Sequence, residues 1–285
     1  MAKITSLAEL TDVASDDLLV VVDKSDTSMA DSGTNKKVKK SNLLKEYAPL
    51  DALLTGWIPA GETWTYASAD DPTFTFTISG DKTSKYSAGM RIKLTQTTVK
   101  YFIITAVSYS SPNTTITVYG GTDYDLANAT ITNPYYSTQK APQGFPLNPA
   151  KWTITTTYTS LWVKHNPVNK VWYNVGMISI PIGSWNINYI ADVFADENAG
   201  VGRIDIYATL STSNNSQSTA EHTIRMTTSS VSLQGAVLQY TGSLVLTSKT
   251  AYYLNIKLDN TTSPLDLGCD GSQIPLRIKA TCAYL

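Results

Sequence analysis

From Gly56 to the last residue, the sequence is a succession of short segments in which apolar residues alternate with Thr, Ser or Tyr. Alternation with a period of two places successive side chains on opposite faces of a β-strand, so each segment predicts a half-buried strand. Turn signals such as Ser79-Gly80-Asp81 and Ser111-Pro112-Asn113 separate the segments. We therefore expect an all-β protein with many turns.

The composition agrees with an all-β fold. Ser and Thr together make up about a quarter of the 285 residues, and the chain contains 17 Tyr. Thr is β-branched, and both Thr and Tyr favour strands. Hydrophobic residues account for 42% of the chain, which is enough for packed cores, and the length allows two ordinary domains.

The charge gives no sign of a polyanionic partner. The net charge is −1 and the pI is about 6.1, which is not the electrostatic footprint of a protein that binds nucleic acid or an anionic membrane. The basic run at residues 36–40 is short, and runs of this kind usually form a solvated face or a strand edge. No nucleic acid is expected as a partner.

The sequence predicts neither a secretory signal nor a membrane span. Residues 1–10 lack a charged stretch followed by a long apolar run, and the apolar run at residues 18–22 is far shorter than the roughly 18 residues of a span. We expect a soluble protein made in the cytoplasm. Cys269 and Cys282 could pair, but an isolated pair is not a disulfide framework, and we expect both to be reduced and partly buried.

The first fifty residues differ from the rest and hold much of the charge. Residues 18–22 predict a buried strand, and residues 36–40 predict a returning strand with Val38 on its inner face. Ser41 is placed to cap a short helix through Leu43, Leu44 and Tyr47, which Pro49 would end. These elements are too small to hold a core alone, so the segment docks either on the next domain of its own chain or on another protein assembly.

The sequence divides into three parts. Residues 1–55 form an N-terminal anchor segment, residues 56–148 a small β domain, and residues 149–285 a C-terminal β-sandwich. The middle part predicts a small barrel or sandwich, with strands at residues 63–67, 73–78, 90–94, 99–107 and 114–119. Met90, Ile92 and Leu94 lie on one face of their strand. Residues 141–146 form an extended linker.

The C-terminal part predicts about eight strands, the number of a jelly roll or a similar sandwich. They lie at residues 152–158, 171–180, 185–194, 204–210, 222–226, 236–246, 251–258 and 274–285. Residues 259–264 are predicted to be a loop. The last strand is expected to hold the end of the chain in a sheet.

No constellation of catalytic residues is visible, so we expect a non-enzymatic protein without metal or cofactor. His165 and His222 are too few for a metal site, and both are expected in loops or at the surface. The acid clusters, expected in turns and at the surface, are Asp70/Asp71, Asp123/Asp125 and Asp192/Asp196/Glu197. A glycosidase needs two acids that flank a bond, and nothing marks these as such a pair.

Aromatic side chains at loop ends are the other candidates for function, because a Tyr or Trp ring can stack on a sugar. Most are expected to lie in cores or between subunits. The candidates are Trp57, Trp64, Tyr66, Tyr135 and Tyr136 in the middle domain, and Trp162, Trp172, Tyr173 and Trp185 in the last.

The first half of the chain resembles structural proteins of tailed bacteriophages. Its start resembles the N-terminal segment of many tail and fibre proteins, and the middle domain looks like a module common in phage structural proteins. The residues that carry the resemblance are Ile4-Thr5-Ser6-Leu7, residues 15–23 and 33–38, and then residues 56–64, 90–94, 118–124 and 140–146. The C-terminal half resembles such proteins only in style.

The resemblance implies a location and partners but carries no catalytic residues. It implies a virion protein whose N-terminus docks on other virion proteins, whose distal β domain faces outward, and which forms a homotrimer. The leading hypothesis is a fibre or spike subunit that binds the host surface, a glycan or a protein, through the C-terminal domain. A purely structural role as a head fibre, decoration protein or tail adaptor is the alternative, and a polysaccharide depolymerase is the least favoured.

Overall fold

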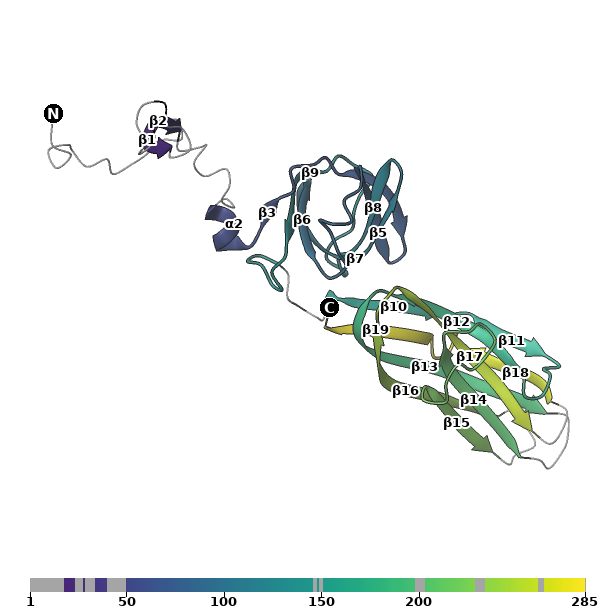
Figure 1. Ribbon diagram of the computed structural model, residues 1–285. Helices are drawn as coiled ribbons and strands as arrows, with labels where there is room; N and C mark the ends of the chain where they lie inside the picture. The colour runs from purple at the N-terminus through teal and green to yellow at the C-terminus, as the bar shows by residue number, and fades with distance from the viewer. Residues whose placement is uncertain are drawn as a thin grey trace. The chain divides into compact units, whose positions relative to one another are not determined.

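The computed structural model describes residues 18–23, 28, 34–39, 50–145, 148, 151–197, 203–228, 234–260 and 264–284. The chain divides into two compact units, of which one comprises residues 1–59 and 142–144 and the other residues 60–141 and 145–285. The regular structure in the described residues is almost entirely antiparallel β-sheet, which confirms the predicted class (Figure 1). The domain limits after residues 55 and 148 stay predictions.

The first unit contains the predicted N-terminal hairpin. β1 (Leu18–Asp23) pairs antiparallel with β2 (Thr34–Lys39), and Leu18 lies opposite Lys39. Lys36 is exposed, as expected for a lysine run on a solvated face. The side chain of Val38 and the predicted helix that begins at Ser41 lie outside the described residues.

A short helix that was not predicted follows the hairpin. α2 (Leu50–Thr55) begins directly after Pro49, which we had interpreted as the end of a helix. Proline is favoured at the start of a helix because the first turn needs no N–H from it. Gly56, with a φ of 76°, ends the helix, and the two-residue strand β3 (Ile58–Pro59) comes after it.

The first part of the second unit is a single curled sheet. Its strands are β4 (Thr65–Asp70), β5 (Thr73–Ser79), β6 (Arg91–Gln96), β7 (Thr98–Ser110), β8 (Asn113–Tyr119) and β9 (Thr132–Ser137). They are hydrogen-bonded in the order β9-β6-β7-β8-β5-β4. Residues 63–66 and 128–131 line one cavity, so the two ends of the sheet approach each other. The domain is therefore an open barrel (Figure 1).

The barrel closes around one apolar core, as the alternation predicts. Ile92 and Leu94 of β6 are fully buried, and Met90 packs against the same core. Trp64 stacks on Phe76 at the centre, with ring centroids 4.6 Å apart. Burying a large apolar side chain stabilises the fold by about 1.5–3 kcal/mol. Because several such side chains lie on one face of each strand, the alternation favours turning that face towards the core.

The second part of this unit is a sandwich of two sheets. Its strands are β10 (Thr153–Tyr158), β11 (Leu161–His165), β12 (Trp172–Ile180), β13 (Gly183–Glu197), β14 (Ile204–Ser211), β15 (Thr223–Thr228), β16 (Gln234–Leu246), β17 (Thr250–Asn260), β18 (Pro264–Asp270) and β19 (Leu276–Tyr284). One sheet has the order β12-β17-β14-β15. The other has the order β10-β19-β13-β18-β11, with β16 along the far side of β13.

The connectivity is that of a jelly roll. β19 and β18 pair with successive halves of β13, and β10 and β11 pair with β19 and β18 in turn. Each of these two pairs is therefore one strand with a break in it. If each interrupted pair is counted as one strand, the first sheet has the order β10/β11, β19/β18, β13, β16. The second sheet has the order β12, β17, β14, β15. This is the strand order of two interlocked Greek keys.

The long strand β13 supplies the centre of the jelly-roll core. Every second residue from Trp185 to Ala195 is fully buried, and the residues between them are half-buried or exposed. Ile206 and Ala208 of β14 and Leu254 of β17 are fully buried as well. Cys269 and Cys282 are free and buried. In the part of the chain described, no helix has the length and apolar character needed to cross a membrane.

Candidate functional site

The jelly roll has a pocket where two neighbouring strands break at the same level. The ladder between β10 and β19 ends at Tyr158 opposite Leu276, and the ladder between β11 and β18 begins at Leu161 opposite Asp270. Thr159 and Ser160 on one strand, and residues 271–275 on the other, lie between the ladders. Both breaks open over the interior of the sandwich.

Gly271 allows the two breaks to meet. A Cβ atom at this position would lie 2.6 Å from the Tyr158 carbonyl oxygen and 2.9 Å from the Ser160 carbonyl oxygen. Such contacts are shorter than side chains tolerate, so only glycine permits this approach of the two backbones. The pocket therefore depends on one residue without a side chain.

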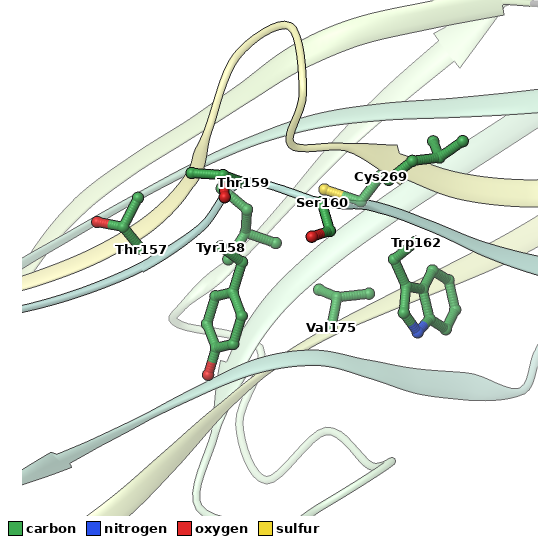
Figure 2. Close-up of a pocket in the computed structure, with 9 residues that line it drawn as sticks. Thr157, Tyr158, Thr159, Ser160, Trp162, Val175 and Cys269 are labelled. Carbon is green, nitrogen blue, oxygen red and sulfur yellow. The ribbon is translucent and has the colours of Figure 1, made fainter.

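The pocket has a volume of about 340 Å³, an apolar floor and aromatic walls. Val175, Cys269 and Leu276 form the buried floor. Figure 2 shows the rings of Tyr158 and Trp162 on either side of Val175, with Ser160 between them. Volumes of a few hundred Å³ are typical of small-molecule sites.

Tyr158 is held in place by the opposite sheet. Its hydroxyl oxygen accepts a hydrogen bond from the Met177 N–H at 2.9 Å and lies 3.2 Å from the Met177 carbonyl oxygen, to which it donates. A Cβ atom on Gly176 would lie 2.8 Å from the Tyr158 ring. The bulge of β12 at Gly176 therefore makes room for this wall of the pocket.

The rim of the pocket carries hydroxyl groups that no other described residue engages. Thr157, Thr159 and Ser160 are exposed lining residues, and within the described chain their hydroxyls have no hydrogen-bond partner. Each hydroxyl can donate one hydrogen bond and accept others. The rim can therefore bind a ligand that is itself rich in hydroxyls.

The pocket contains no charged side chain among its lining residues. Its thiol is not a nucleophile, because burial and the nearby carboxylates of Asp192 and Asp270 raise the pKa of Cys269 to about 12. Only a thiolate reacts readily, so the group is inert near neutral pH. The pocket offers hydrogen bonds and aromatic surface and no acid–base chemistry.

The structure separates the predicted sugar-stacking aromatics into two classes. Trp57, Trp64 and Trp185 are buried, and none of them presents a free ring face. Tyr66, Tyr135 and Tyr136 are half-buried in the barrel, where Tyr136 packs edge-on against Tyr86 at 5.6 Å. The barrel aromatics are therefore mainly core or core-rim residues, as was expected of most aromatics.

The three other candidates are half-buried in the jelly roll. Trp162 lines the pocket, and its ring centroid lies 6.4 Å from that of Tyr173. Trp172 lies in the other sheet, 6.4 Å from Tyr207. Of the predicted aromatics, only Trp162 lines the pocket, and Tyr173 packs beside it.

Each histidine occupies one of the two expected settings, the surface or a loop. His165 ends β11, is exposed, and its Nδ1 lies 2.6 Å from Asp266 Oδ1. His222 lies in the turn before β15, but its side chain is buried, and its Nδ1 lies 2.9 Å from the Tyr240 hydroxyl. Its ring also lies 5.6 Å from that of Tyr240, a contact that short-range sequence signals do not show. The described residues contain no group of three or more His, Cys, Asp or Glu side chains suited to hold a metal.

The acid clusters occupy turns and sheet surfaces. Asp70 and Asp71 form the β4–β5 turn, and Asp123 pairs with Lys151 at 3.1 Å. Asp125 is exposed. In β13, burial and the neighbouring Asp270 raise the pKa of the Asp192 carboxyl.

Asp196 lies opposite Asp266 across the β13–β18 ladder, and Glu197 ends β13. The structure thus brings Asp192 near Asp270, an acid that was not part of its predicted cluster. None of these carboxylates lines the pocket.

Sequence reasoning found Trp162 but missed Tyr158 and the hydroxyl rim. The segment from Tyr158 to Trp162 reads Tyr-Thr-Ser-Leu-Trp and contains no glycine, proline or asparagine. Nothing in it therefore marks a break in the strand. A run of five Thr or Ser residues around Tyr158, at positions 155–160, was the only available signal.

Comparison with known proteins yields no family. No family model and no curated protein matches the sequence. Among solved structures, the chain is similar to the infectious bursal disease virus VP2 subviral particle protein, with 12% identity over 78% of this chain and 63% of that chain and a TM-score of 0.28.

Two further solved structures have a similar level of likeness. The T13 particle of infectious bursal disease virus has 12% identity over 78% of this chain and 61% of that chain, with a TM-score of 0.30. The Arthrobacter globiformis T6 isomalto-dextranase complexed with panose has 11% identity over 79% of this chain and 34% of that chain, with a TM-score of 0.21. The chain spans less than two thirds of these structures, and the low TM-scores carry no argument about function.

Proposed function

We propose that this protein is a non-enzymatic virion protein of a tailed bacteriophage that binds a neutral saccharide of the host surface through the jelly-roll pocket. Three observations support the proposal. The first half of the sequence resembles phage structural proteins, the C-terminal domain has jelly-roll connectivity, and the pocket suits a saccharide. Jelly rolls occur in both capsid and lectin domains, although a fold alone does not specify a function.

The observation that carries the proposal is the composition of the pocket. Trp162 and Tyr158 offer flat apolar faces, and Thr157, Thr159 and Ser160 offer unengaged hydroxyls. A pyranose ring has an apolar face of C–H groups and a rim of hydroxyls, so both halves of its surface find a counterpart. The absence of charge among the lining residues favours a neutral sugar.

The chemistry of the same pocket supports a non-enzymatic role. Hydrolysis of a glycosidic bond requires an acid and a second carboxylate or a water-activating base at the bond. The lining residues include neither, and the Cys269 thiol stays protonated. A ligand in this pocket would be bound and released unchanged.

The test measures binding of the full-length protein to host cells and to purified neutral surface polysaccharide. We expect W162A to weaken binding about tenfold or more, because it removes one aromatic wall. Y109A is the matched control, since Tyr109 is an exposed aromatic residue of β7 in the barrel. Equal binding by the wild type and W162A would exclude this pocket as the receptor site.

Because Trp162 is half-buried, a second variant separates binding from folding. S160A with T159V removes two rim hydroxyls from exposed positions and leaves the apolar floor intact. We expect this variant to unfold at the wild-type denaturant concentration and to bind several-fold more weakly. Retention of full affinity by both variants would leave the proposal without support.

A purely structural role in the virion is the second candidate, and the edge strand β16 favours it. β16 pairs only with β13 among the described strands, and residues 234–246 contain no charged residue and no proline. Val237 and Val245 are exposed along it, Val245 at 79%. Proteins normally protect such an edge, and a neighbouring virion subunit, including another copy in a homotrimer, would protect it by pairing.

Electron cryomicroscopy of the particle distinguishes these roles. The attachment role predicts the N-terminal segment among virion proteins and the pocket facing solvent. The structural role predicts that β16 and the pocket are both covered by neighbouring subunits.

A further inference from the structure

The outer face of the second jelly-roll sheet carries one row of aromatic and cationic side chains. Trp172 of β12 lies opposite Lys257 of β17, Lys257 lies opposite Tyr207 of β14, and Tyr207 lies opposite Arg225 of β15. Each of the four strands contributes one residue. We call these four residues the aromatic–cation row.

The rings and cations of the row are in contact. Lys257 Nζ lies 4.7 Å from the ring centroid of Trp172 and 4.4 Å from that of Tyr207. Arg225 Cζ lies 6.0 Å from the Tyr207 centroid. Cation–π contacts at these distances hold the ammonium group between two rings, so the row is ordered before any ligand binds.

Neither cation of the row has an ion-pair partner within the described chain. The acids of the adjacent row are engaged elsewhere, since Asp205 pairs with Arg203 at 2.7 Å and Asp259 lies 3.8 Å from Lys170. Asp205 also attracts Arg225 electrostatically, but no carboxylate of the described chain forms an ion pair with Lys257 or Arg225, so both cations can still receive an anionic ligand. A cation over an aromatic face still attracts an anion.

A cavity of about 340 Å³ lies beside the row, with Gln217, Thr223 and the two cations in its lining. Gln217 belongs to the loop after β14, which folds back over the sheet. The buried Asn255 holds this loop by donating to the Ser213 and Ser216 carbonyl oxygens at 3.0 and 2.7 Å. One wall of the cavity is thus fixed in advance, which lowers the entropic cost of binding.

We infer that this cavity is a second saccharide site and that it binds a carboxylated sugar. The guanidinium group of Arg225 can bind a carboxylate through two parallel hydrogen bonds, and Lys257 adds a second charge. The ring of Tyr207 offers a face for the sugar. Gln217, whose Nε2 donates to Thr223 Oγ1 at 2.7 Å, offers its amide oxygen as an acceptor for the sugar hydroxyls. The inference goes beyond the neutral-saccharide pocket, which has no charge and lies in the other sheet.

The test uses isothermal titration calorimetry on the full-length protein. The probes are three carboxylated oligosaccharides, tri-galacturonic acid, tri-mannuronic acid and sialyllactose. Their neutral counterparts are galactotriose, mannotriose and lactose. We expect at least one acid to bind about tenfold more tightly than its neutral counterpart, with affinity that decreases as salt increases.

Two variants locate the binding. R225Q and K257Q each remove one charge, and each should weaken the acidic sugar about tenfold. K93Q is the matched control, because Lys93 makes a similar contact with the Tyr135 ring at 4.2 Å in the barrel. Thermal unfolding of every variant checks that the fold is intact, and R225K should restore part of the affinity.

Three results would overturn the inference. They are the absence of binding by all three acids, unchanged affinity in both R225Q and K257Q, and full competition by inorganic phosphate at equal concentration, which would indicate a general anion site. Binding of neutral saccharide is measured in the same variants. If W162A loses binding of neutral saccharide and R225Q keeps it, the two sites are independent, and a negative result at one site does not count against the other.

Discussion

Tyr158 joins the two sheets of the jelly roll with a single hydroxyl. It bonds to both backbone groups of Met177, and its ring packs over Gly176. These contacts explain why an exposed tyrosine at a strand end has a fixed orientation. The same ring forms a wall of the pocket, so one side chain serves the sheet packing and the proposed binding site.

We expect Y158F to lower the free energy of unfolding by about 0.5–1.5 kcal/mol, because it removes the hydrogen bonds to the Met177 N–H and carbonyl, which water can partly replace. Urea denaturation measures the change. Y109F is the control, since Tyr109 is also exposed at a strand end, and it should stay within about 0.5 kcal/mol of the wild type. An equal effect of both substitutions would contradict the role of the hydroxyl.

The substitution G176A should destabilise the protein by about 1–3 kcal/mol, because the new Cβ would lie 2.8 Å from the Tyr158 ring. Gly235 provides the comparison. A Cβ there would meet its nearest atoms at 3.4 and 3.6 Å, which is ordinary contact. G235A should therefore be tolerated, and a larger loss of stability in G235A than in G176A would refute the packing argument.

Buried thiols and phenols make the fold sensitive to alkali. Burial raises the pKa of Cys269 from 9.0 to about 12 and that of Cys282 to about 11, and it also raises the pKa values of Tyr119 and Tyr189. Above about pH 9 the unfolded chain loses thiol protons that the folded protein keeps. The free energy of unfolding should therefore fall as the pH rises through this range.

Urea denaturation between about pH 8 and about pH 11 checks the alkaline prediction. C269V replaces the thiol by a side chain of similar size, and its stability should fall less steeply with pH. A thiol reagent at neutral pH should modify neither cysteine before unfolding. Rapid modification of the native protein would show that the thiols are accessible, contrary to their burial.

At the scale of elements, periodicity predicted nearly every strand with a regular pattern. All eight C-terminal segments expected to be strands contain one. The strands β3, β9, β11 and β18 were missed. β9 begins with Thr-Asn-Pro, a sequence that signals a turn. β18 begins at the last residue of the predicted loop 259–264, and no element was predicted for the rest of it.

The missed strands β11 and β18 are the second halves of the two interrupted strands. Counting eight segments therefore gave the right number of jelly-roll positions, although it left out two pieces of the sheet. Pairing between strands distant in sequence holds these pieces in place, and no local pattern reports that pairing. For the same reason the pocket between them could not be predicted.

At the scale of the whole molecule, the resemblance assigns attachment to the first unit and recognition to the second. The hairpin of β1 and β2 belongs to the unit of residues 1–59 and 142–144, whereas both proposed saccharide sites belong to the other unit. Composition changes at the same place in the sequence. Loss of the hairpin should therefore separate assembly from binding.

We expect a chain that lacks residues 1–49 to be absent from purified particles and to bind saccharide with unchanged affinity. Immunoblotting of particles and calorimetry of the truncated protein measure the two properties. W162A is the converse control, because it should enter particles and fail to bind. Incorporation of the truncated chain at the wild-type level would show that the anchor lies elsewhere.

The double break in the sheet also bears on how the protein can diversify. Residues 272–275 are exposed and lie outside both ladders, so insertions or substitutions there leave the pairing on either side unchanged. Loops that connect intact ladders tolerate changes in length at small entropic cost. Related chains could thus vary the surface beside the pocket by altering one short segment, while the register that holds the jelly roll together is inherited intact.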